Sequence, residues 1–155
     1  MDAKKVIGVS GAGIATFMNF IAICIFWKYA IGGTPWFSVM TLLAFLAGGL
    51  CVVVRIADLL ADMGTITVAF IKDNKKMIAL LILGAGCGAA FLAFLSFIGF
   101  TADVTKRPSA LRSALMKSNY GSSYICVILS LPAHAINVII GAMALTGGAT
   151  AAPAS

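Results

Sequence analysis

Long apolar runs and short polar segments alternate along the chain. Four runs contain no Asp, Glu, Lys or Arg: residues 6–27, 36–54, 77–102 and 124–145. An α-helix rises about 1.5 Å per residue and a bilayer core is about 30 Å thick, so about 20 apolar residues cross it. The pattern therefore predicts an all-α fold, an integral membrane antiparallel four-helix bundle, with spans at about 6–28, 36–58, 77–101 and 123–145.

The polar segments predict the domain organisation. We expect an N-terminal cytoplasmic segment (1–5), one domain of four transmembrane helices (6–145), and a disordered tail (146–155) that contains only Gly, Ala, Thr, Pro and Ser. Helix-compatible sequence continues past the second run to about residue 71, so this helix projects into water, bends near Gly64 or lies along the membrane surface. The longest connection contains a segment, 109–117, suited to one or two amphipathic helical turns.

The orientation depends on the basic residues in the connections. An even number of spans places both termini on the same side of the membrane. Six Lys and Arg residues fall on that side and five on the other, which is nearly balanced. Lys4 and Lys5 lie next to the first span, and the first span often dominates the positive-inside rule, so we expect both termini in the cytoplasm.

Composition limits the classes of protein. Hydrophobic residues make up 61% of the chain and charged residues 10%, whereas a soluble protein has about 25% charged residues, so no room is left for a separate soluble domain. The net charge of +6 is spread over short connections beside the spans, where it favours anionic lipid head groups over nucleic acid as a partner. The four cysteines fall one in each apolar run without a C-x-x-C pair, which indicates packing residues.

The sequence contains no pattern typical of an enzyme. Glutamate is absent, no carboxylate pair lies in an apolar run, and neither G-x-S-x-G nor a metal-ligand spacing of His, Cys and Asp occurs. We therefore predict no catalytic residues, no metal and no cofactor.

Small residues recur at helical spacing within the spans. Gly84 and Gly88 form a G-x-x-x-G in the third span, and Ala44 and Gly48 form a related pair in the second. Helices associate in lipid by close backbone approach, which small residues permit. Two interpretations stay open: packing within the bundle, or a subunit contact through the third span that gives a homo-oligomer or a hetero-oligomer with other membrane proteins.

Arg55, Asp58 and Asp62 share one helical face at the end of the second span. Nineteen uncharged residues precede Arg55, which is enough to place it at the membrane interface. The plain interpretation is a solvated face in which Arg55 and Asp58 form an i, i+3 ion pair. The alternative is a partner-binding or conduction-lining polar face that includes Asn137 of the fourth span.

His134 lies three residues before Asn137, on the same face of the fourth span. An interhelical hydrogen bond is the ordinary interpretation of a histidine in this position, and ligation of a pigment by the imidazole is the alternative. Because the chain has one histidine, a bis-histidine haem within one subunit is excluded.

The order of segments is a short N-terminus, four spans, a small first loop, a basic middle turn, a longer final loop and a short tail. This organisation resembles the MARVEL-type tetraspan membrane proteins, in particular the CASP-like group of plants and green algae. The first and third spans lack the arginine and aspartate typical of that group, so no site residue carries over. The resemblance implies a multi-pass plasma-membrane protein that self-associates into dimers or larger scaffolds and has no enzymatic activity.

We therefore expect a membrane scaffold protein that acts through helix-mediated self-association. A channel or transporter subunit with a polar face on the second span is one alternative. An accessory subunit of a larger membrane complex, binding pigment through His134, is the other.

Overall fold

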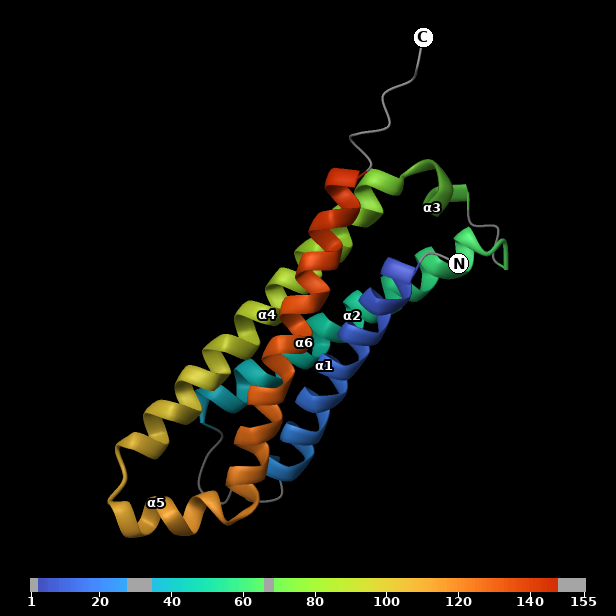
Figure 1. Ribbon diagram of the computed structural model, residues 1–155. Coiled ribbons are helices and arrows are strands. Elements are labelled where there is room, and N and C mark those ends of the chain that lie inside the picture. Colours follow the sequence, from blue (N-terminus) through green and yellow to red (C-terminus); the bar gives the residue numbers. More distant parts are fainter. Residues whose placement is uncertain (1–2, 28–34, 66–68, 148–155) are drawn as a thin grey trace.

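The computed structural model describes residues 3–27, 35–65 and 69–147. These residues form helices and no strand, which confirms the prediction of an all-α fold (Figure 1). The helices are α1 (Ala3–Trp27), α2 (Trp36–Asp62), α3 (Ala69–Asp73), α4 (Lys75–Thr105), α5 (Ser109–Met116) and α6 (Asn119–Gly147).

Four of these helices, α1, α2, α4 and α6, are long and apolar enough to cross a membrane, which indicates a multi-pass membrane protein. Each of the last three extends beyond its expected span: α4, for example, has 31 residues, a length of about 46 Å. Helix α1 begins at Ala3, within the segment expected at 1–5, and α6 ends at Gly147, within the tail expected at 146–155. Residues 148–155 of that tail lie outside the described part of the chain.

The four long helices lie side by side. Helix α1 contacts α2, α2 contacts α4, α4 contacts α6, and α6 contacts α1. Figure 1 shows that α1 begins and α6 ends at one end of this assembly, which we call the terminal end. The short helix α5 crosses the opposite end, which we call the α5 end.

Of the three courses left open for the second helix, the structure shows a break near Gly64. Helix α2 ends at Asp62, and Gly64 has a φ of +74°, a conformation that glycine adopts without steric cost. The N–H groups of Gly64 and Thr65 donate to the carbonyls of Ala61 and Leu60 and so close the last turn. The short helix expected at 109–117 is confirmed as α5, in which no residue is buried.

The interior differs between the two ends. At the α5 end, aromatic rings fill it: the centroids of Phe37 and Phe100 are 4.4 Å apart, and Tyr120 and Tyr124 pack beside them. Towards the terminal end the buried apolar cluster consists of Ala, Cys and Ile side chains instead of aromatic rings, and the buried Arg55 and Asn137 lie close to it. Large apolar side chains instead cover the outside, including Phe17, Leu46, Leu50, Val53, Leu80, Phe91 and Ile139. An outer surface of this kind is favourable in lipid and unfavourable in water.

Candidate functional site

Polar side chains line the interior between the four long helices. The described residues that are both polar and buried are Asn19, Thr41, Arg55, Ser96, Ser123, Ser130, His134 and Asn137. Because an unpaired polar group costs several kcal/mol in an apolar interior, the partners of these residues decide what the interior can do.

His134 and Asn19 link α6 to α1. His134 is 1% exposed, and its Nε2 lies 3.0 Å from the Asn19 amide nitrogen. Since an amide nitrogen only donates, Nε2 accepts the hydrogen bond and the neutral imidazole carries its proton on Nδ1. The interhelical hydrogen bond expected for His134 is confirmed. His134 Nδ1 and Asn19 Oδ1 have no hydrogen-bond partner among the described residues.

Ala44 and Gly48 pack inside the structure. This agrees with the first of the two interpretations of the small residues, packing within the bundle. Ala44 is fully buried, and a Cβ on Gly48 would lie 2.6 Å from the Thr16 hydroxyl oxygen and 3.8 Å from His134 Cε1. The missing side chain at Gly48 therefore lets α1 and α6 approach α2. Farther towards the α5 end, the hydroxyls of Thr41 and Ser96 lie 2.5 Å apart and join α2 to α4.

Arg55 and Asn137 form a second polar contact, one that crosses the interior from α2 to α6. Arg55 is only 7% exposed, and its Nη2 donates to the Asn137 backbone carbonyl at 2.8 Å. The Asn137 side chain donates to Cys51 Sγ at 3.4 Å, and a Cβ on Gly86 would lie 2.9 Å from its Nδ2. Arg55 Nε has no hydrogen-bond partner among the described residues.

Two glycines form the slot that holds the Arg55 guanidinium. A Cβ on Gly8 of α1 would overlap Arg55 Nη1, and a Cβ on Gly141 of α6 would lie 3.4 Å from Nη2. The expectation of a solvated Arg55 paired with Asp58 is therefore wrong. The guanidinium turns inwards because neighbouring helices place glycines beside it, and Asp58 has another partner.

That partner is Lys5 of α1. Its Nζ lies 2.6 Å from an Asp58 oxygen and 2.5 Å from an Asp62 oxygen, and Lys75 of α4 lies 3.1 Å from the second Asp62 oxygen. These ion pairs join the start of α1, the end of α2 and the start of α4. Both aspartates keep part of their surface exposed, as expected for a solvated face.

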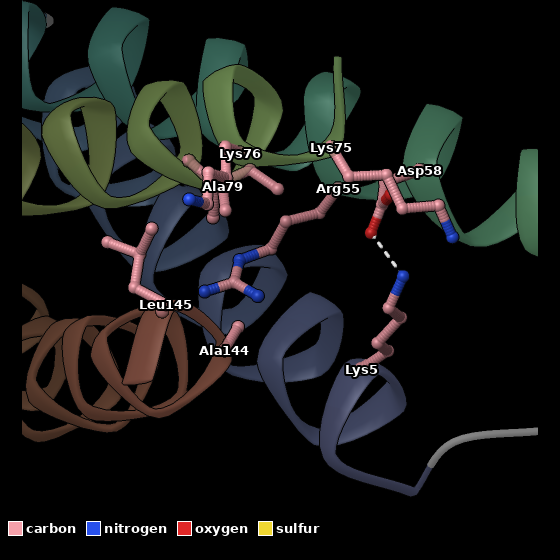
Figure 2. Close-up of a pocket in the computed structure, with 10 residues that line it drawn as sticks. Lys5, Arg55, Asp58, Lys75, Lys76, Ala79, Ala144 and Leu145 are labelled. Carbon is pink, nitrogen blue, oxygen red and sulfur yellow. Dashed lines mark hydrogen bonds and ion pairs between the residues drawn. The ribbon is translucent and has the colours of Figure 1, made fainter. Parts of the chain in front are cut away.

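A pocket of about 360 Å³ opens beside Arg55 at the terminal end. Figure 2 shows the Arg55 guanidinium between α1, α4 and α6, with Lys5 reaching Asp58 on one side and Lys76 on the other. Basic side chains outnumber acidic ones in its wall, and the remainder is apolar. The lining residues are Lys5, Arg55, Asp58, Lys75, Lys76, Ala79, Ile82, Gly141, Ala144 and Leu145.

Gly84 and Gly88 lie on the outer face of α4. A Cβ on either residue would meet no atom within 4 Å, whereas Gly86, between them, faces the interior. The interpretation that this pair packs inside the bundle is therefore wrong. The buried face of α4 runs through Ile78, Ile82 and Gly86, and residues two positions away point to the opposite side.

The structure thus brings Arg55 and Asn137 into contact, and places Asp58 and Asp62 at the rim of the same region. Sequence reasoning missed Asn19 and Lys5. Asn19 carried a signal, because it is the one amide inside the first apolar run, where a polar side chain usually marks an interhelical contact. No local signal connects Lys5 to residues more than fifty positions away.

Among residues 3–27, 35–65 and 69–147, no group of three His, Cys, Asp or Glu side chains is arranged to hold a metal ion. Comparison with known proteins found no matching family model, no matching curated protein and no matching solved structure.

Proposed function

We propose that the protein is an integral membrane antiparallel four-helix bundle that acts as a scaffold, without catalysis, through self-association of α4. The contact would involve the outer face that contains Gly84 and Gly88. The proposal places the protein in the plasma membrane with both termini in the cytoplasm, in keeping with the resemblance to the CASP-like group and with Lys4 and Lys5 in the first turn of α1.

The orientation of the G-x-x-x-G on α4 is the observation that carries the proposal. Both of its glycines lack neighbours within 4 Å, so their missing side chains do not serve the packing of a single chain. Large exposed side chains lie one turn before and after them, at Leu80, Leu81 and Phe91. A notch between bulky side chains fits a second helix at close range, which is how such motifs associate in lipid.

Cys87 makes this contact testable, because it is exposed and lies beside Gly88 on the outer face of α4. Cys51 is buried and can stay, so a reporter for α4 needs only Cys24→Ser and Cys126→Ser. We expect oxidation of native membranes with copper phenanthroline to cross-link this reporter into dimers. The matched control keeps Cys24 of α1 and carries Cys87→Ser and Cys126→Ser; it should stay monomeric.

Substitution of leucine for Gly84 and Gly88 provides a second test of the contact. Gly84→Leu with Gly88→Leu should abolish the Cys87 cross-link, because two isobutyl groups keep the backbones apart. Gly49→Leu is the control, since Gly49 of α2 also has open space around it. Equal cross-linking in the notch variant and the control would contradict the proposal.

A channel or transporter subunit is the second candidate, favoured by the polar interior from Thr41 to Arg55. Flux of small ions into proteoliposomes tests it, with Asn137→Leu as the variant that should remove the flux. The scaffold proposal expects no flux above that of protein-free vesicles.

A further inference from the structure

We propose that the pocket at the terminal end is a binding site for a phosphate group, carried by an anionic lipid head group or by a soluble phosphate compound. This inference is independent of self-association, because the pocket lies between α1, α2, α4 and α6 and not on the outer face of α4.

The charge of the pocket points to an anion. Lys5, Arg55, Lys75 and Lys76 line it, and Asp58 is the one carboxylate in its wall. Asp58 is already neutralised by Lys5 at 2.6 Å. Even with Asp62 of the adjoining ion pairs included, positive charges exceed negative ones by two. Low-dielectric walls strengthen the field of this excess inside the pocket.

The burial of Arg55 distinguishes this pocket from a solvated patch of basic residues. The residue is only 7% exposed, yet among the described residues it forms no ion pair, and its Nε donates to no acceptor. One neutral carbonyl, that of Asn137, accepts from the guanidinium. A buried cation is stable only with an opposing charge or with several hydrogen bonds. A phosphate group supplies both, and the planar guanidinium is the side chain best suited to it.

The slot between Gly8 and Gly141 holds the guanidinium in place before any ligand arrives. Because the position is fixed by backbone and not by mobile side chains, binding requires little ordering of Arg55. Lys76 is exposed and can close over the bound group from the side of α4, while Lys75 beside it pairs with Asp62 at 3.1 Å and adds its charge to the wall.

The position of the pocket across the membrane matches the level of the lipid phosphates. Trp36 begins α2 at the α5 end, and Arg55 lies nineteen residues further, which is about 28 Å along the helix. This distance is close to the thickness of the hydrocarbon core, about 30 Å, so Arg55 reaches the opposite interface. The apolar wall, Ala79, Ala144 and Leu145, suits the glycerol and upper acyl region of a lipid, and the volume falls in the usual range of ligand pockets, about 300–1,000 Å³.

Binding is tested on the full chain purified in an uncharged detergent. The probes are dioctanoyl phosphatidic acid, dioctanoyl phosphatidylglycerol, inorganic phosphate and dioctanoyl phosphatidylcholine, each titrated at constant ionic strength while the melting temperature is followed. A ligand that binds the folded state raises the melting temperature saturably. We expect phosphatidic acid to do so and phosphatidylcholine, which carries no net charge, to have no effect. Saturation by inorganic phosphate would assign the site to a soluble compound, and saturation by the two anionic lipids alone would assign it to a head group.

Two double variants separate the pocket from general surface charge. Lys75→Gln with Lys76→Gln removes two positive charges from the pocket wall and should weaken phosphatidic acid binding at least about tenfold. Lys106→Gln with Lys117→Gln removes the same charge at the α5 end, where both residues are exposed, and should leave the affinity within about twofold. All four substitutions lie on exposed side chains, so the fold is expected to persist.

The proposal is overturned if none of phosphatidic acid, phosphatidylglycerol and inorganic phosphate gives a saturable shift, or if both double variants lose affinity equally. A third variant, Arg55→Lys, keeps the positive charge but loses the planar set of N–H donors of the guanidinium. It should weaken binding if it melts at the wild-type temperature without ligand, and unchanged affinity in such a folded variant would also overturn the proposal.

Discussion

Alanine at Gly8 tests the slot that holds Arg55. The added methyl group would overlap Arg55 Nη1, so the guanidinium must move away from α1. Moving it breaks or bends the 2.8 Å hydrogen bond from Nη2 to the Asn137 carbonyl, because Gly141 blocks the other side of the slot. A hydrogen bond from a charged donor contributes about 1.5–3 kcal/mol.

The change from glycine to alanine also favours any helix, by about 1 kcal/mol. Gly13→Ala isolates that effect, because Gly13 lies in the same helix and a Cβ there meets nothing within 4 Å. We expect Gly13→Ala to be neutral or slightly stabilising. The free energies of unfolding of the two variants should then differ by about 1.5–3 kcal/mol, with Gly8→Ala the less stable.

Reversible unfolding in mixed micelles, followed by tryptophan fluorescence, measures both values. A double-mutant cycle tests the mechanism: in an Arg55→Ala background the cost of Gly8→Ala should fall, because the guanidinium is gone and the tight contact that remains is with Ile140 Cγ2, 3.0 Å from a Cβ at Gly8. Equal stability of the Gly8 and Gly13 variants, or an undiminished cost without Arg55, would contradict a slot that holds the guanidinium.

Three further outcomes are expected. Asn19→Leu should lower the unfolding free energy by about 0.6–1.7 kcal/mol, the range of interhelical hydrogen bonds in membranes, and should cost almost nothing more once His134→Leu is present, as a double-mutant cycle would report. Lys5→Gln should cost at most about 1 kcal/mol and lose its effect in high salt, since the pairs it breaks are partly exposed; a salt-independent cost measured by the same unfolding would contradict this. Gly86→Leu should prevent folding, whereas Gly84→Leu should leave monomer stability unchanged, and detergent-exchange gel filtration of both would reveal any reversal.

Much of the fold follows from the spacing of charges along the chain. The long helices occupy the four uncharged runs because an apolar helix satisfies its own backbone in lipid, and this constraint acts locally. Gly64 was identifiable as a break for a similar reason, since its positive φ needs no partner from elsewhere in the chain.

The candidate site was less predictable, because its residues are defined by contacts between distant segments. A helical face can be read around Arg55, but the choice between solvent and interior depends on which helix lies opposite. Gly8 and Gly141, more than one hundred and thirty positions apart, decide it. The spacing of Gly84 and Gly88 can be recognised in the sequence as a helix-packing motif. That the two glycines face outwards depends on the rotation of α4 about its axis, which only the structure shows.

The most direct test of the membrane arrangement is the reactivity of cysteines placed on the outer face. Leu50 of α2 and Ile139 of α6 are 59% and 57% exposed in the isolated chain, and Ser113 of α5 is exposed as well. In opened membrane fragments, on a background with Cys24, Cys87 and Cys126 changed to Ser, a water-soluble maleimide needs a hydrated thiolate to react. We expect Ser113→Cys to be labelled readily, and Leu50→Cys and Ile139→Cys to be labelled only after denaturation, because acyl chains cover them. Labelling of Leu50→Cys or Ile139→Cys at the rate of Ser113→Cys in intact fragments would contradict a membrane-embedded chain.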